Sequence, residues 1–302
     1  MTRIMRHTGT RAALAAGIGC AVLFAGAADA QTPATAPRPP ANRLDALPSC
    51  YALAKIKQPA RVADRAIFVL LDQTTLFDAS LRQTIQSAAR TNLKPATEFA
   101  FGTFSAFLDN RYTDVLLGGR TDVPLLPAER DDTGKSALRV LDQCVGRQLD
   151  YAKRLTDAEL SKAFGGMSAT IARSDVFASL HDFSTHVVAP AKARSKTLLI
   201  ASDMLENSSL ASFYSNRSVR KLDSAVELER VKSAGLIPDL KGVRVYVIGA
   251  GLLNTAGAKN VAESYRDPQT MLALQNFWSG YFKAASAELV EFGKPQLLRP
   301  VE

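Results

Sequence analysis

The sequence predicts an α/β fold, with a doubly wound, mostly parallel central sheet and helices on both of its faces. Two runs of strand length, Ala66–Leu71 and Thr197–Ala201, contain hardly any polar residue, and each is followed within two residues by an aspartate. A third apolar run covers Val243–Ile248. Strands that are apolar on both faces are typical of buried parallel sheets. The segments between them have helical periodicity, which is the alternation expected of α/β proteins.

The remaining elements follow from periodicity and turn signals. Helical spacing predicts four helices: Leu81–Asn92 with Ala79-Ser80 at its start, Gly134–Phe164, Ala169–His186 and Pro268–Ala287. Alternation predicts further strands: Thr97–Phe107, its partner Asp114–Leu117 across a turn at Asp109-Asn110, and a final edge strand Glu288–Phe292. The closing helix carries an aromatic stripe that we expect to pack against the sheet as core: Phe277, Trp278, Tyr281 and Phe282.

The N-terminus has the features of a secretory signal peptide. Three arginines precede an apolar stretch, Ala12–Ala28, and Ala28-Asp29-Ala30 fits a small-x-small cleavage site. We therefore expect residues 1–30 to be removed and the protein to be periplasmic or secreted, without a transmembrane anchor. The alternative is a lipoprotein signal in which Cys20 is lipidated.

Residues 31–43 are rich in Pro, Ala and Thr, which predicts an extended tether. Residues 44–302 contain no second linker of this kind and are expected to form one domain. Removing residues 1–30 would lower the formal net charge from +8 to +6, because three arginines and one aspartate are lost. The remaining basic residues are spread along the chain, which argues against nucleic-acid binding.

Two cysteines, Cys50 and Cys144, remain after the signal peptide. An even number of cysteines in an exported chain predicts a disulfide. Such a bond would stabilise the fold by roughly 4–5 kcal/mol in the chain-entropy model. The alternative is two unrelated buried thiols. The sequence has no Cys-x-x-Cys, so a redox or zinc role has little support.

Three segments together resemble a von Willebrand factor A (VWA) domain over roughly residues 62–298. Asp72-Gln73-Thr74-Thr75-Leu76 is similar to the Asp-x-Ser/Thr-x-Ser motif of the family's MIDAS-type metal site. Arg173–Leu180 looks like its Gly-Thr-Asp-Ile segment, at the entry to a helix. Leu199–Met204 matches its strand ending in Thr-Asp-Gly, and Val245–Gly251 resembles the strand that follows.

The resemblance implies a three-layer, Rossmann-like sandwich whose metal site binds a partner protein. Carried over position by position, the metal ligands are Asp72, Thr74, Ser174 and Asp203. The cofactor would be Mg²⁺ or another divalent cation, with an open position for a carboxylate of the partner. Leu76 replaces the second hydroxyl of the first motif and Met204 replaces a glycine, so the motif is degenerate and we expect weak affinity. Thr75 is expected to point away from the site.

Two alternatives to a protein-binding metal site remain open. Asp72 and Asp203 could instead cap helices that follow their strands, which would make the chain a metal-free structural or interaction domain. They could also serve a metal-assisted hydrolase, although neither His181 nor His186 is placed at either motif. The main prediction is an exported module that binds another extracytoplasmic protein.

Other motif-like segments have simpler interpretations. Gly249–Asn254 resembles part of a dinucleotide fingerprint but comes late in the chain, which favours a strand-to-loop turn. His181 and His186 are five residues apart, a spacing that does not favour zinc. Gly118-Gly119-Arg120-Thr121-Asp122 looks like the second metal motif, but its position after a strand pair favours a turn at the edge of a hairpin.

Overall fold

The computed structural model describes residues 44–302, except for 109–110, 169–172, 216–217 and 254–266. The signal-peptide and tether predictions lie outside the described residues, as does the turn at Asp109-Asn110. None of the helices described is both long and apolar enough to span a membrane.

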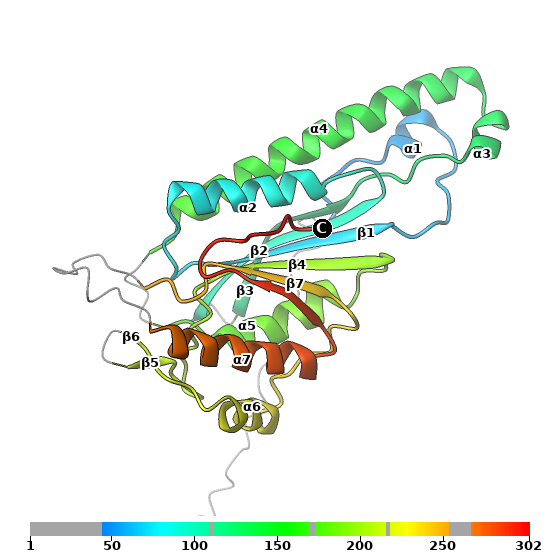
Figure 1. Ribbon diagram of the computed structural model, residues 1–302. Coiled ribbons are helices and arrows are strands. Elements are labelled where there is room, and N and C mark those ends of the chain that lie inside the picture. Colours follow the sequence, from blue (N-terminus) through cyan, green and yellow to red (C-terminus); the bar gives the residue numbers. More distant parts are fainter. Residues whose placement is uncertain (1–43, 109–110, 169–172, 216–217, 254–266) are drawn as a thin grey trace, which may run out of the picture. The chain divides into compact units, whose positions relative to one another are not determined.

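One six-stranded sheet organises the domain (Figure 1). Its strand order is β3-β2-β1-β4-β7-β8. If the six strands of this sheet are numbered 1 to 6 along the chain, the order becomes 3-2-1-4-5-6, the doubly wound order. All neighbours are parallel except β3, which pairs antiparallel with β2. The strands are β1 (Arg65–Asp72), β2 (Thr97–Leu108), β3 (Arg111–Arg120), β4 (Ser195–Ala201), β7 (Arg244–Ile248) and β8 (Glu288–Phe292).

The central strands are buried on both faces because successive side chains alternate between two hydrophobic cores. Phe68, Leu70 and Ile200 belong to one core, whereas Val69 and Leu199 belong to the other. This alternation explains why the strands read as continuous apolar runs in the sequence. The three runs predicted to be parallel neighbours are indeed β1, β4 and β7, side by side.

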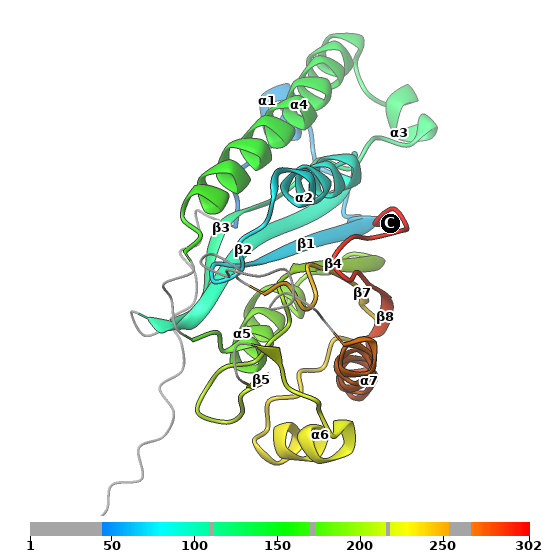
Figure 2. The same ribbon diagram turned by 60° about the vertical axis from the view of Figure 1, so that its left-hand side comes forward.

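Helices cover both faces of the sheet (Figures 1 and 2). On one face lie α2 (Ala79–Asn92) and α4 (Lys135–Gly165). On the other lie α5 (Val176–Phe183), the π-helical turn η2 (Ser184–Val188), α6 (Ser224–Ser233) and α7 (Pro268–Ala284). The aromatic stripe of α7 is fully buried in this second core, as predicted.

Smaller elements extend this framework. A short helix, α1 (Cys50–Ala54), packs on α4. Another short helix, α3 (Pro127–Asp131), comes directly before α4 in the chain. A two-stranded ribbon, β5 (Tyr214–Ser215) and β6 (Ser218–Val219), follows β4.

Three of the expected boundaries were wrong. The helix predicted from Ala169 begins only at Val176, because Ser174 pairs with Asn207 in an isolated β-bridge and Asp175 caps the helix. The last helix ends at Ala284 rather than Ala287, and Ala287 N–H bonds to Phe282 O in the turn that leads to β8. Gly118–Arg120 belongs to β3 and is not a turn.

Candidate functional site

Two aspartates meet at the carboxyl edge of the sheet. Asp72 is the last residue of β1, and Asp203 lies two residues beyond the end of β4. Their strands are parallel neighbours with Leu71 opposite Ala201, so the segments that follow leave the sheet side by side. Both aspartates are buried. The expectation that Asp72 and Asp203 share one edge is met.

Hydroxyl groups surround the carboxylate of Asp72. Its Oδ1 accepts hydrogen bonds from the backbone N and the Oγ1 of Thr74, at 2.9 and 2.6 Å. Its Oδ2 accepts from Ser202 Oγ at 2.8 Å and from Ser174 Oγ at 3.3 Å. The three motif segments of the sequence therefore converge on one carboxylate.

Asp203 is held by a different set of partners. Leu205 N donates to its Oδ1 at 2.9 Å, and the hydroxyl of Tyr214 bonds to its Oδ2 at 2.7 Å. The backbone N–H of Asp203 donates to Thr75 Oγ1 at 3.1 Å, and the Thr75 hydroxyl also bonds to Asp72. Thr75 is buried and links the two aspartates, so the expectation that it points away from the site was wrong.

The burial of these carboxylates changes their protonation. Desolvation raises the pKa of Asp72, although the hydrogen bonds from Thr74 and Ser202 oppose that effect. Desolvation, followed by repulsion from Asp72, raises the pKa of Asp203 to about 8. Burial, together with the nearby Asp203, also raises the pKa of Tyr214. At neutral pH this edge therefore favours a protonated Asp203 beside a neutral tyrosine.

The helix-cap alternative for these aspartates is wrong. Asp78, not Asp72, caps the helix after β1, accepting from Leu81 N at 2.8 Å. The segment after Asp203 forms a loop that leads to β5, with a β-bridge at Asn207. Each aspartate accepts from the backbone N–H two residues later, which is the pattern of an Asx turn.

The oxygen atoms at this edge are of the kind that bind hard cations, but they form only part of a coordination shell. Carboxylate and hydroxyl oxygens are the ligands that Mg²⁺ and Ca²⁺ prefer, and Thr74, Ser174 and Ser202 keep oxygen lone pairs while donating to Asp72. Leu76, at the position of the missing hydroxyl, is 41% exposed. Within the described residues, no three His, Cys, Asp or Glu side chains gather into a metal-holding group. A cation would therefore rely on hydroxyls and would compete with Tyr214 for Asp203.

Met204 replaces the glycine of the third motif and adopts the conformation in which a glycine is favoured. Its φ is 59°, in the left-handed region that costs an ordinary residue about 1–2 kcal/mol. Its side chain is fully buried, and its carbonyl accepts from Trp278 Nε1 at 3.0 Å. Apolar burial and this hydrogen bond offset the backbone strain, and they hold the loop after β4 in place.

The other candidate motifs do not form sites among the described residues. Gly249 and Gly251 have φ values of 100° and 69°, as a turn after β7 requires, and Asn254 lies outside the described residues. His186 Nδ1 contacts the backbone oxygen and the carboxylate of Asp182. The sequence did not identify Tyr214, which lies eleven residues after Asp203 in an irregular loop. Ser202 was visible next to Asp203, but its bond to Asp72 was not predicted.

No protein-family model matches the sequence, and no curated protein matches it. Among solved structures, the SpRpn10 VWA domain is 12% identical, with 78% of this chain and 90% of that chain covered and a TM-score of 0.35. An aerotolerance-related membrane protein from Bacteroides fragilis is 9% identical, with 76% and 92% covered and a TM-score of 0.33. The pilus adhesin SpaC from Lactobacillus rhamnosus GG is 11% identical, with 75% and 31% covered and a TM-score of 0.32.

The fold is a doubly wound α/β sandwich, consistent with a VWA-like or Rossmann-like architecture. The three motif segments share the carboxyl edge of its sheet, and the likeness to these solved structures concerns the fold alone.

Proposed function

We propose that the chain is an exported protein-binding module that presents the carboxyl edge of β1 and β4 to a partner protein. The observation that carries the proposal is the convergence of Thr74, Ser174 and Ser202 on Asp72. Hydroxyls gathered around a buried carboxylate form an unusually polar end to an otherwise apolar sheet. The disulfide between Cys50 and Cys144 favours a periplasmic or secreted location.

A divalent cation held weakly by Asp72, Thr74, Ser174 and Asp203 is part of the same proposal. When bound, the cation would offer an open coordination position to a carboxylate of the partner. The chain itself orients the hydroxyls through Asp72 and covers Asp203 with Tyr214. Leu76 and the protonation of Asp203 both make the affinity low.

Binding fits this edge better than hydrolysis. Even a metal-assisted hydrolase needs a general acid or base that can reach its substrate, whereas a cation that binds a partner's carboxylate does not. Asp72 is fully buried, and Asp203 lies behind the Tyr214 hydroxyl. Among the described residues, His181 and His186 are both on the segment that packs beneath the sheet and are not partners of either aspartate.

The cation is tested by thermal melting in millimolar Mg²⁺, Mn²⁺ or Ca²⁺. Binding to the native state should raise the melting temperature in proportion to the logarithm of free cation above the dissociation constant. Asp72→Asn should remove this dependence, whereas Asp150→Asn, an exposed aspartate on α4, should keep it. A wild-type melt that is indifferent to all three ions would remove the cation from the proposal and leave the protein-binding role standing.

The partner is tested separately with a photo-crosslinking amino acid at position 76, whose side chain is exposed beside the site. The matched control carries the same group at position 272, where the leucine is 53% exposed on α7. The proposal expects a crosslinked protein at position 76 that is absent at position 272 and weakened by Tyr214→Phe. Identical products at the two positions would contradict a binding surface at this edge.

A further inference from the structure

A second surface lies far from the Asp72 edge, between the amino-terminal half of α4 and the short helix α1. A cavity of about 270 Å³ opens there, lined by Pro48, Leu53, Val140, Gln143, Cys144, Arg147, Gln148 and Tyr151. Figure 1 shows α1 beside the amino-terminal half of α4, away from the carboxyl ends of the strands. We call this cavity the α1–α4 groove.

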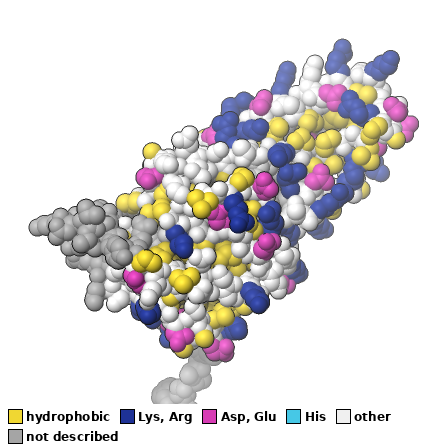
Figure 3. Space-filling view, in the orientation of Figure 1, with side chains coloured by type: hydrophobic (Ala, Val, Ile, Leu, Met, Phe, Trp, Pro, Cys, Tyr) yellow, Lys and Arg dark blue, Asp and Glu magenta, His cyan; other side chains and the backbone are white. Residues whose placement is uncertain are grey.

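The apolar side chains of the groove are open to solvent. Leu53 is 64% exposed, Val140 38% and Tyr151 42%, although each is a large hydrophobic residue. On α4, Val140, Cys144, Arg147 and Tyr151 follow one another at spacings of four, three and four, so they share one face of the helix. Figure 3 shows hydrophobic side chains over this end of the molecule, with Lys, Arg, Asp and Glu side chains around them. An apolar patch with a polar rim is the usual mark of a binding surface.

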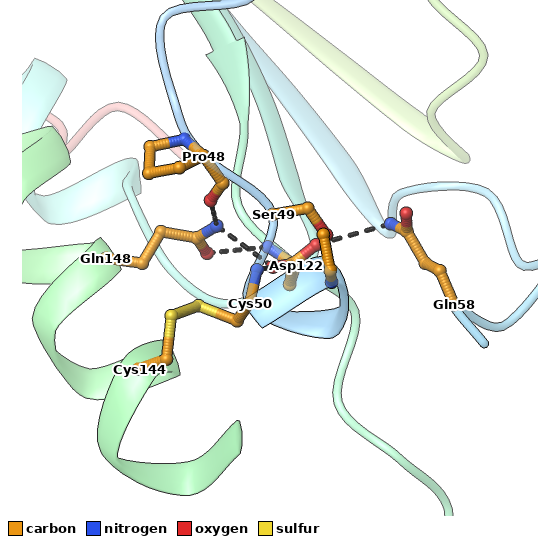
Figure 4. The surroundings of a disulfide bond; sticks show 8 residues. Pro48, Ser49, Cys50, Gln58, Asp122, Cys144 and Gln148 are labelled. Atoms are coloured by element: carbon orange, nitrogen blue, oxygen red, sulfur yellow. Dashed lines mark hydrogen bonds between the residues drawn. A yellow bond between two sulfur atoms is a disulfide. The ribbon is translucent and has the colours of Figure 1, made fainter. Parts of the chain in front are cut away.

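The groove has rigid walls, because several bonds join its two sides (Figure 4). The disulfide Cys50–Cys144 ties α1 to α4 directly. Gln148 of α4 donates to Pro48 O at 2.8 Å and to Asp122 Oδ2 at 3.0 Å. Asp122 Oδ2 also accepts from Cys50 N at 2.6 Å. A groove fixed in this way is available to a ligand without a cost for ordering its walls.

The charges of the groove identify the kind of occupant. Its lining includes one cation, Arg147, and no carboxylate. Residues 31–43 carry two arginines and no carboxylate, so the chain's own tether would meet like charge there. A second copy docking through the same groove would likewise bring the Arg147 side chains of the two copies together. An acidic partner has the complementary charge.

We propose that the α1–α4 groove binds an amphipathic helix of a partner protein, with an apolar face against Leu53, Val140 and Tyr151 and an Asp or Glu beside Arg147. Grooves between helices are commonly filled in this way, with anchors at intervals of three and four residues. The proposal does not depend on the role of the Asp72 edge.

The probe is a synthetic amphipathic peptide of about 16 residues, long enough to form a helix, with Leu on one face and Glu on the other. A twin peptide carries Lys in place of Glu. Fluorescence anisotropy with the full chain should detect the acidic peptide and little of its twin. Leu53→Ser and Arg147→Glu should each weaken binding about tenfold or more, and Arg147→Glu should also reverse the preference between the peptides. Leu272→Ser and Lys283→Glu on α7 are the matched controls and should change nothing.

Several results would overturn the proposal. The acidic peptide could fail to bind, or it could bind no more tightly than its Lys twin. Leu53→Ser could also leave the peptide affinity unchanged while the melting temperature shows that this variant is folded. A concentration-dependent dimer that Leu53→Ser dissociates would assign the groove to a second copy. An affinity that rises when residues 31–43 are deleted would assign it to the tether.

Discussion

Two buried aspartates at opposite edges of the same sheet, Asp72 and Asp122, show how the donors around a carboxylate decide what it can do. Asp122 follows β3, at the amino ends of β1 and β2, and accepts from Cys50 N, Gln148 Nε2 and Gln58 Nε2. All but one of the bonds to Asp72 come from hydroxyl groups, those of Thr74, Thr75, Ser174 and Ser202. An amide N–H has no lone pair to offer a cation, whereas a hydroxyl oxygen does. Asp122 can therefore only crosslink the chain, while Asp72 could exchange its donors for ligands.

The largest expected effect is at the Asp122 end. Replacing Cys50 and Cys144 together by Ser removes a crosslink between residues 94 positions apart. The free energy of unfolding should fall by about 4–5 kcal/mol, because the unfolded chain regains the entropy of an open loop. Urea denaturation measures this loss, and reduction of the wild-type protein should reproduce it. Two free thiols in the unfolded, unreduced protein would contradict the prediction.

The comparison itself is tested by Asn at each position. Asp122→Asn should cost about 2–3 kcal/mol, because a neutral amide oxygen accepts more weakly than a carboxylate from Cys50 N and Gln148 Nε2. Asp72→Asn should change stability by about 1 kcal/mol or less, since Ser174 and Ser202 can rotate to accept from the new amide. Chemical denaturation at pH 7 measures both. Equal losses at the two positions would break the comparison.

The sheet was predictable because burial on both faces leaves continuous apolar runs in the sequence. These runs identified β1, β4 and β7 and predicted that the three strands are parallel neighbours. The helix α6 was missed because Ser224–Ser233 is rich in charge and buries little besides Val231 and Glu227. Glu227 is buried through ion pairs with Arg220 and Arg230, which no periodicity of apolar residues reveals.

The site was predictable only where its residues lie in motifs attached to strand ends. Asp72, Thr74 and Asp203 were found that way, and Ser174 through the resemblance to a helix-entry segment. Tyr214 reaches Asp203 from an irregular loop, and its position depends on tertiary packing that the sequence does not display. Thr75 was misjudged because the direction of a side chain in a loop depends on the hydrogen bonds of that loop, here to Asp203 N and Asp72.

The Asp72 end should also respond to pH, through Glu206 in the loop after β4. Desolvation, followed by the charge of Asp175, raises the pKa of Glu206 to about 8, while Phe177 N donates to its Oε2 at 3.0 Å. The native state then holds a proton that the unfolded chain releases above about pH 4.5, near the ordinary pKa of glutamate. Stability should therefore fall as pH rises from about 4.5 to 8, by up to about 1.4 kcal/mol per pH unit from this group.

Glu206→Gln tests this dependence, because an amide of similar shape does not titrate. The variant should flatten the decline in the free energy of unfolding between pH 5 and 8, although Asp203, whose pKa is raised in the same direction, will leave part of it. Tyr112 and Tyr281 also interact electrostatically with Glu206, but their raised pKa values keep both neutral between pH 5 and 8. Asp175, whose pKa burial also raises, will leave a further part of the decline. Denaturation curves at several pH values give the slope, and an unaltered slope in the variant would contradict the assignment.

The smallest expected effect on stability, and the sharpest test of the hydroxyl argument, is Leu76→Ser. Leu76 is exposed, so its replacement should change the free energy of unfolding by no more than about 0.5 kcal/mol. If hydroxyl lone pairs are what distinguish the Asp72 edge, a further hydroxyl at this position should strengthen divalent-cation binding by about 2–10-fold, the equivalent of one modest polar contact. Leu76→Ala removes the same side chain without adding an oxygen and should leave the affinity at the wild-type level. Calorimetric titration with Mn²⁺ compares the three proteins. Equal gains in the Ser and Ala variants would mean that Leu76 merely obstructs the site, and the hydroxyl argument for this edge would then be lost.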